Sequence, residues 1–372
     1  MTILSLFDGM SCGHLALDRA GVNVSEYFAA EIDKYAITVT QANYPQTIQL
    51  GDVTQIKGAD LPTIDLLIGG SPCQGFSFAG KQLNFEDPRS VLFFEYVRLR
   101  RELGAKNPDL YFLLENVKMK KESQDVITKF LGVEPIEINS ALVSAQNRKR
   151  LYWTNIEGVE QPEDRGVLLR GILQPPDEVD QSFNRSITNK DFNGLSPNGK
   201  SGTLRTSGHD TPTEKHNFDI VKLNKKRGLK QNQNKASCLT SGGNHSDMDI
   251  IGLNPASIVG RRMNENGHRE DYNKNVPITQ CLQVKHSPAK AGCLTTVEKD
   301  NVLSNMPPGR YPDAYNNEDI QFRRLTPIEC ERLQTVPDNY TNHVSNSQRY
   351  KMLGNGWTVD VIAHIFKNMM YI

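Results

Sequence analysis

The sequence has no pair of cysteines spaced as C-x-x-C and no apolar run approaching the roughly 20 residues that span a bilayer. Its 6 cysteines are scattered, which argues against a zinc site or a redox dithiol and favours a reducing compartment. The N-terminus runs directly into a predicted strand, with no secretory signal ahead of it. These absences predict a cytoplasmic protein that holds no metal and contacts no membrane.

Neither sign of charge is in excess, since Lys and Arg balance Asp and Glu at 43 each, but the charges are unevenly distributed. Between Arg185 and Arg310 there are 19 basic and 11 acidic residues, so the rest of the chain is acidic. A chain of 372 residues is longer than one core usually serves, so two domains are expected. The basic insert suggests a polyanionic partner, although an ordinary solvated surface explains the charge equally well.

The N-terminal residues are typical of a nucleotide-binding α/β unit. A predicted strand at Ile3–Phe7 leads into D-G-M-S-C-G and then a helix. The loop is not a full G-x-G-x-x-G, because Ser11 stands where the second glycine would be. Glu31 follows a second strand and can bond ribose hydroxyls, and Asp52 follows a third and can bond an adenine amino group. This pattern serves NAD and S-adenosylmethionine (SAM) alike.

The stretch at 65–80, D-L-L-I-G-G-S-P-C-Q-G-F-S-F-A-G, reads as a buried strand that opens into a loop. Cys73 lies beyond the carboxyl end of this strand, where open α/β sheets bind their ligands. Pro72 restricts the backbone before it, and the nearby glycines let a ligand come close. A cysteine here can be a nucleophile if its thiol pKa is lowered, whereas an arbitrary cysteine is more often a buried structural thiol. The turn residues favour the nucleophile.

Two later segments also carry polar side chains suited to chemistry. Leu110–Leu114 reads as a buried strand that ends at Glu115. Q-N-R-K-R precedes another strand, and in an extended segment Gln146, Arg148 and Arg150 point to one side. A solvated basic surface is the alternative interpretation for this cluster.

The C-terminal residues predict two helices. T-P-I-E at 326–329 is a capping box with proline at the first helical position, which predicts a helix to about Leu333. Val359–Met370 carries apolar residues at helical spacing and predicts a second helix.

Four motifs stand in a fixed order, F-D-G-M-S-C-G, G-G-S-P-C-Q-G-F-S, E-N-V and Q-N-R-K-R. With R-R-L-T-P-I-E-C-E-R-L-Q and L-G-N-G-W-T-V near the C-terminus, they resemble the DNA cytosine-C5 methyltransferases, in detail the de novo, animal-type branch. The resemblance implies a Rossmann-like, SAM-dependent α/β core with a mostly parallel sheet at 1–157 and 320–372. It also implies a smaller, irregular β-rich target-recognition domain at 158–319.

The resemblance also implies roles for the motif residues. Cys73 would add to C6 of a cytosine flipped out of the duplex, which activates C5 for methylation by SAM and releases S-adenosylhomocysteine. Glu115 would hold N3 and N4 of the base, and Arg148 would support O2 and help to keep Cys73 ionised. Arg150 would stand behind these groups or face phosphate. The motifs add two further members of the catalytic set, Gln146 and Asn116.

The cofactor pocket implied by the same resemblance draws on both ends of the chain. Its predicted residues are Phe7, Asp8, Gly9, Glu31, Ile32, Asp52, Val53, Pro72, Leu92, Asn355 and Trp357.

The insert at 158–319 is rich in Asn, Gly, Ser, Thr and Lys, and three fragments recur in it, G-K-S-G-T-L-R-T, N-K-A-S-C-L-T-S and A-K-A-G-C-L-T-T. We interpret them as related strand–turn elements of one β-rich domain. Its basic residues would hold phosphates while polar loops read base edges in the major groove. A flexible polar insertion is the competing interpretation.

The sequence therefore predicts a monomeric enzyme that methylates C5 of cytosine in double-stranded DNA, in a phage or beside a cognate restriction endonuclease. An RNA (tRNA) cytosine methyltransferase and a catalytically silent DNA-binding regulator are the alternatives. The basic insert favours duplex DNA over RNA, and the intact Cys73, Glu115 and Arg148 speak against a silent regulator. A zinc deaminase is excluded, because no cysteine follows Cys73 at the required spacing.

Overall fold

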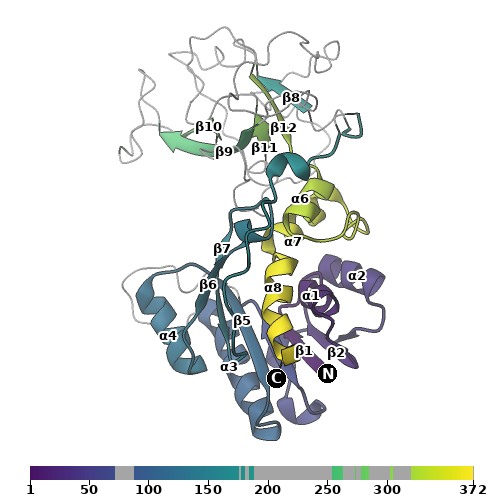
Figure 1. Cartoon of the computed structure of the whole chain (residues 1–372), viewed down its shortest axis with the longest axis vertical. Helices are drawn as coiled ribbons and strands as arrows, with labels where there is room; N and C mark the ends of the chain where they lie inside the picture. The colour runs from purple at the N-terminus through teal and green to yellow at the C-terminus, as the bar shows by residue number, and fades with distance from the viewer. Residues whose placement is uncertain are drawn as a thin grey trace. The chain divides into compact units, whose positions relative to one another are not determined.

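A computed structural model describes residues 1–71, 88–175, 177–180, 184–187, 254–262, 273, 278–284, 302–304 and 320–371 (Figure 1). These residues fall into two compact units, one formed by Met1–Ile172 with Pro327–Ile372 and one formed by the segments between them. The division comes after residues 172 and 326, whereas the sequence placed it after 157 and 319. Among the described helices, none has both the length and the apolar character needed to cross a bilayer.

The first unit is built on a seven-stranded sheet, whose strands are β1 (Thr2–Leu6), β2 (Glu26–Ala30), β3 (Ile48–Gln49), β4 (Leu66–Gly69), β5 (Tyr111–Val117), β6 (Ile136–Asn139) and β7 (Lys149–Thr154). Their order is β3-β2-β1-β4-β5-β7-β6. Strands β1 to β5 pair in parallel, and β7 runs antiparallel to both β5 and β6. The mostly parallel, Rossmann-like sheet predicted from the sequence is confirmed.

The helices of this unit are α1 (Cys12–Ala20), α2 (Lys34–Asn43), α3 (Pro88–Lys106), α4 (Lys121–Leu131), α6 (Pro327–Leu333), α7 (Asn346–Asn355) and α8 (Val359–Lys367). Short 3-10 turns lie at Val53–Gln55, Gly58–Asp60, Ser140–Leu142, Leu169–Gly171 and Asn368–Tyr371. Helix α1 ends at Gly21, whose positive φ of 77° suits a residue without a side chain. Helix α2 is capped by Asp33, which accepts from the Tyr35 backbone N–H at 3.0 Å.

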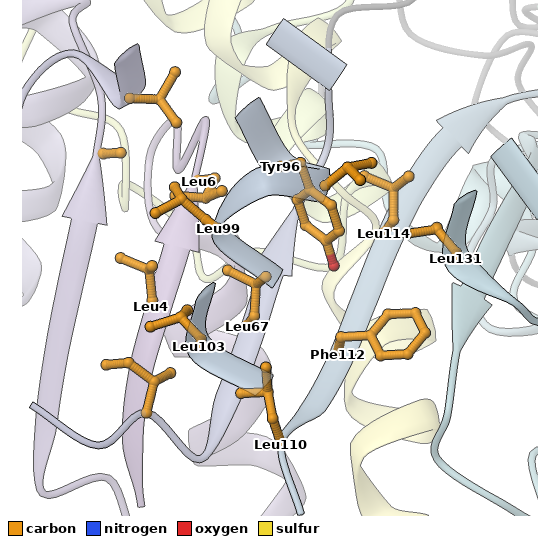
Figure 2. Close-up of a cluster of buried hydrophobic side chains, with 14 of the residues drawn as sticks. Leu4, Leu6, Leu67, Tyr96, Leu99, Leu103, Leu110, Phe112, Leu114 and Leu131 are labelled. Carbon is orange, nitrogen blue, oxygen red and sulfur yellow. The ribbon is translucent and has the colours of Figure 1, made fainter. Parts of the chain in front are cut away.

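Helices cover both faces of the sheet because side chains alternate along each strand. On β4, Leu67 joins the core beneath α3, which Figure 2 shows. Its neighbour Ile68 points to the other face, where a Cβ added to Gly13 of α1 would lie 2.4 Å from Ile68 Cδ1. Each fully buried leucine of the α3 core contributes about 1.5–3 kcal/mol. The side chains labelled in Figure 2 are Leu4, Leu6, Leu67, Tyr96, Leu99, Leu103, Leu110, Phe112, Leu114 and Leu131.

The second unit contains a five-stranded sheet made of β8 (Asn184–Ile187), β9 (Asn254–Arg262), β10 (Ile278–Val284), β11 (Val302–Ser304) and β12 (Ile320–Arg324). The order is β10-β9-β11-β12-β8, and every neighbouring pair is antiparallel. The β-rich character predicted for the insert is confirmed, and β12 belongs to this sheet because it pairs with β8 and β11. The three recurring fragments lie outside the described residues.

Candidate active site

The strand order of the first unit reverses between β1 and β4, and this is where open α/β sheets bind ligands. The chain leaves β4 at Gly69 and enters the segment that carries Pro72 and Cys73. Both of these residues lie outside the described part of the chain. The site is therefore built from the residues around the entry to that segment, Gly70 and Ser71, and from the neighbouring strand ends.

Glu115 of β5 presents a buried carboxylate that is held at both oxygens. Arg150 Nε lies 3.0 Å from Glu115 Oε1, and the indole Nε1 of Trp357 donates to Oε2 at 3.2 Å. Strand pairing explains the first contact, because Glu115 pairs with Tyr152 and residues two apart on β7 share a face. The carboxylate thus has an ion-pair partner at one oxygen and a neutral hydrogen-bond donor at the other, from two separate chain segments.

The entry to the Cys73 segment lies against this carboxylate. Asn116 Nδ2 donates to the carbonyl oxygen of Ser71 at 3.3 Å and lies 3.4 Å from its hydroxyl. A Cβ added to Gly70 would lie 3.2 Å from Glu115 Oε2. Glycine at position 70 therefore lets the chain pass directly beside Glu115, and Asn116 anchors the next residue.

Arg148 and Gln146 hold a different part of the unit. The Arg148 side chain donates from Nη1 to the Gly354 carbonyl at 3.3 Å and from Nη2 to the Gly356 carbonyl at 3.0 Å. Gln146 Nε2 donates to the Leu333 carbonyl at 3.2 Å. We expected Gln146, Arg148 and Arg150 to share one side, but β7 begins only at Lys149, so strand alternation does not extend back to Arg148.

The two arginines differ in the contacts that the structure describes, while their roles toward a base stay predictions. Arg150, expected to stand behind the site or face phosphate, is the one beside Glu115. Arg148, expected beside the base, is only 4% exposed and donates to the Gly354 carbonyl in the last turn of α7 and to the Gly356 carbonyl just after this helix. Asn355, the last residue of α7, is exposed, and Trp357 is half-buried.

On the other side of β1 from β4, the Glu31 carboxylate accepts hydrogen bonds at the end of β2. Its Oε2 accepts from the Gly9 backbone N–H at 2.8 Å, and its Oε1 accepts from the Ile32 and Asp33 N–H groups at 2.7 and 2.8 Å. The Ile32 side chain is 77% exposed. Gly9, which bonds Glu31, has a positive φ. An exposed apolar side chain beside a fixed carboxylate suits the apolar ring and the hydroxyl groups of a nucleoside.

Asp8 turns its carboxylate into the protein rather than toward a ligand. Ser11 Oγ donates to Oδ2 at 2.5 Å, and the Tyr27 hydroxyl donates to Oδ1 at 2.8 Å. Burial raises the pKa of Asp8 from 3.8 to about 6. Phe7 and Ser11 both have φ of 58°, a strained value for residues with a side chain. Asp8 thus fixes the shape of the loop.

The remaining predicted cofactor residues differ in exposure. Asp52 is exposed and its Oδ1 accepts from the Thr54 backbone N–H at 2.9 Å. The Val53 side chain is buried in the α3 core, and the partly buried Leu92 packs against the same core. Among the described residues, no three His, Cys, Asp or Glu side chains lie close enough together to hold a metal ion.

Sequence reasoning missed the residues that support this site. Gln334 accepts from the Thr358 hydroxyl at 2.9 Å and donates from Nε2 to the Gly356 carbonyl at 3.2 Å. Tyr27 anchors Asp8, and Ser71 bonds Asn116. Gln334 ends the motif R-R-L-T-P-I-E-C-E-R-L-Q, so its place in a motif was the available signal.

The comparisons with known proteins cover the whole chain. A family model described as C-5 cytosine-specific DNA methylase matches residues 1–371. The Type II methyltransferase M.NgoBV of Neisseria gonorrhoeae is 32% identical over 99% of this chain and 98% of its own length. The orphan methyltransferase M.SPRI of Bacillus phage SPR is 27% identical over 100% and 98%. A crystal structure of a DNMT2 mutant from Spodoptera frugiperda shares the fold, with a TM-score of 0.57 at 17% identity over 99% of each chain.

Proposed function

The chain belongs to the C-5 cytosine-specific DNA methylase family, as its motifs predicted, and we propose that it methylates C5 of a flipped-out cytosine in a specific double-stranded DNA sequence. The observation that carries the proposal is the doubly held carboxylate of Glu115 at the entry to the segment with Cys73. A cytosine inside the stacked duplex cannot reach such a recessed group, so the base must leave the helix.

The Glu115 carboxylate is suited to the polar edge of cytosine. Each carboxylate oxygen offers about two acceptor positions; Trp357 donates to one on Oε2, and Arg150 forms an ion pair with Oε1. The remaining positions can accept from the N4 amino group and from a proton shared with N3. A proton at N3 offsets the negative charge that develops in the ring when a nucleophile adds to it.

Cys73 supplies that nucleophile in the proposed mechanism. Its thiolate forms a bond to C6, and the π-electron pair of the C5–C6 double bond shifts onto C5 and is delocalised toward N3. This charge makes C5 nucleophilic. SAM, when bound, supplies the methyl group. Loss of the C5 proton to a base and cleavage of the bond from sulfur to C6 then restore the aromatic ring and free Cys73.

The residues across the crevice fit the proposed cofactor. Gly9 has φ of 60°, and no atom lies within 4 Å of the position that its Cβ would take. Glu31 and the exposed Ile32 lie beside it, and Asp52 follows β3. In this proposal Glu31 would hold the ribose hydroxyls, Ile32 one face of adenine and Asp52 the adenine amino group.

Arg148, Gln146 and Asn116 act as supports in this proposal. Arg148 donates to the Gly356 carbonyl before Trp357, Gln146 donates to the Leu333 carbonyl at the end of α6, and Asn116 donates to the Ser71 carbonyl. We assign the contact with O2 of the base to the Arg150 side of the pocket, because Arg150 is the arginine beside Glu115. The second unit would bind DNA, since the chain between Arg185 and Arg310 has 19 basic and 11 acidic residues.

Relatives named as Type II and phage orphan methyltransferases suggest a restriction–modification or phage setting, and we propose that the chain acts as a monomer. Bisulfite sequencing of plasmid from cells that express the chain tests the activity and reveals the target sequence. We expect 5-methylcytosine within one short recognition sequence, and none with Cys73→Ser. Modified tRNA with unmodified plasmid would instead support the RNA methyltransferase.

A further inference from the structure

Trp357 lies between the two sides of the proposed site. Its Nε1 donates to Glu115 Oε2 at 3.2 Å, and a Cβ added to Gly70 would lie 3.0 Å from the same nitrogen. On the far side of the ring, a Cβ added to Gly13 would lie 3.5 Å from Cζ3. Gly13 is in the first turn of α1, just after the loop of the proposed cofactor pocket. One indole therefore lies close to the helix behind that loop and donates to the carboxylate that we assign to the base.

The backbone that carries Trp357 is fixed by buried side chains. Arg148 and Gln334 both donate to the Gly356 carbonyl, at 3.0 and 3.2 Å. Thr358, on the other side of Trp357, donates to Gln334 Oε1 at 2.9 Å. Moving the backbone of Trp357 away from Glu115 would break or strain these hydrogen bonds, each worth about 1 kcal/mol and more where the donor is charged. The contact with Glu115 is thus built into the fold.

We propose that Trp357 is a positioning residue for Glu115, which sets the plane of the carboxylate and ties it to the cofactor side of the crevice. The inference rests on the proposed function, because it assigns Glu115 to the base. An indole N–H only donates and does not titrate, so it holds Oε2 in the same way at every working pH. Arg150 of β7 forms an ion pair with Oε1, so the two partners together favour one orientation of the carboxylate.

Trp357→Phe keeps an aromatic ring but removes the donor. We expect the rate of a single methyl-transfer turnover to fall about 10- to 100-fold, the effect of losing a hydrogen bond to a charged group that matters in the transition state. The Kd for S-adenosylhomocysteine should change far less, since the ring still fills the space beside Gly13. A loss confined to that Kd, with the turnover rate intact, would overturn the proposal and leave Trp357 as a wall of the cofactor pocket.

The only other tryptophan provides a matched control, since the chain has 2. Trp153 of β7 is fully buried and donates from Nε1 to Thr128 Oγ1 at 3.0 Å, away from Glu115. Trp153→Phe removes the same atoms and should lower the melting temperature without changing the turnover rate. Equal rate losses in the two variants would mean that Trp357 is merely structural.

Trp153→Phe also leaves Trp357 as the only indole, which gives a readout that needs no turnover. In that background we expect Glu115→Ala to shift the tryptophan emission, and S-adenosylhomocysteine to change it when added to the protein with Glu115 intact. Emission that ignores Glu115→Ala would overturn the positioning role. If the wild-type chain left every DNA unmethylated, the proposed function would fail, while the emission would still decide whether Trp357 holds Glu115.

Discussion

Two buried carboxylates near the carboxyl ends of strands in the seven-stranded sheet, Glu115 of β5 and Asp8 after β1, are stabilised in different ways. Glu115 has the guanidinium of Arg150 3.0 Å from one oxygen. Asp8 accepts from neutral hydroxyl groups, among them those of Ser11 and Tyr27 at 2.5 and 2.8 Å. Burial raises the pKa of Asp8 to about 6.

In the proposed mechanism, this difference separates a carboxylate that binds a ligand from one that supports the backbone. Arg150 forms an ion pair with Glu115 beside the entry to the Cys73 segment. Asp8 faces inward and holds Ser11 in a left-handed conformation that the loop needs. The sequence presented both as polar residues at strand ends, and only their partners distinguish them.

Glu115→Gln should produce the largest effect. The amide cannot supply the proton that N3 needs, so we expect methyl transfer to fall about 10²- to 10⁴-fold, the usual contribution of a positioned acid. Single-turnover methylation of duplex DNA measures it. Asp8→Asn is the matched control and should retain far more activity. A greater loss in Asp8→Asn than in Glu115→Gln would contradict the roles given to the two groups.

Arg150→Met tests the counter-charge of Glu115. It leaves a nearly buried carboxylate without its cation, so we expect the free energy of unfolding to fall by about 3 kcal/mol. Urea unfolding followed by circular dichroism measures the change. Arg150→Lys should recover part of the loss, because it restores the charge without the planar guanidinium. A methionine variant as stable as the wild type would show that Glu115 does not depend on Arg150.

Asp8→Asn should change the pH dependence of stability. The folded pKa of Asp8, about 6, lies above its ordinary value of 3.8, so the folded state binds the proton more tightly. The stabilisation of the folded state by this protonated carboxyl group is present below about pH 4 and is lost as the pH rises through about 6. The free energy of unfolding then falls by about 2–3 kcal/mol.

The asparagine variant lacks this titration, so its stability relative to the wild type should rise across that pH interval. Urea unfolding at several pH values measures it, with Ser11→Ala as a control that keeps the carboxyl group. A stability difference that stays constant with pH would rule out the titration of Asp8.

Lys351→Met should have the smallest effect. Lys351 Nζ lies 2.7 Å from Asp33 Oδ2, but the lysine side chain is 52% exposed. Solvent and salt screen such a pair, so we expect the free energy of unfolding to change by no more than about 1 kcal/mol. Thermal unfolding at low and high salt measures it. A larger loss would place Asp33 with Glu115, among the carboxylates that depend on their cation.

Local sequence signals predicted much of the fold. The capping box at 326–329 predicted the helix that the structure shows as α6, from Pro327 to Leu333. The predicted strand at Leu110–Leu114 continues to Val117, because antiparallel pairing with β7 extends it. The helix at Asn346–Asn355 was not predicted, since its polar sequence gives little apolar periodicity.

The roles of the site residues were harder to read. Arg148 bonds carbonyl groups more than 200 residues away along the chain, at Gly354 and Gly356, and a backbone acceptor has no sequence signature. Arg150 reaches Glu115 through the register of two strands, which motif spacing does not reveal. The motifs therefore supplied the candidate residues, while tertiary pairing decided which of the described ones contact each other.

Covalent trapping tests the central claim most directly. In a duplex that carries 5-fluorocytosine at the target position found by bisulfite sequencing, fluorine cannot leave C5 as a proton does, so the enzyme stays attached. With SAM present, we expect the wild-type chain to form an adduct that survives denaturation and maps to Cys73, and Cys73→Ser to form none. An adduct that persists in Cys73→Ser, or that maps to another cysteine, would contradict the mechanism.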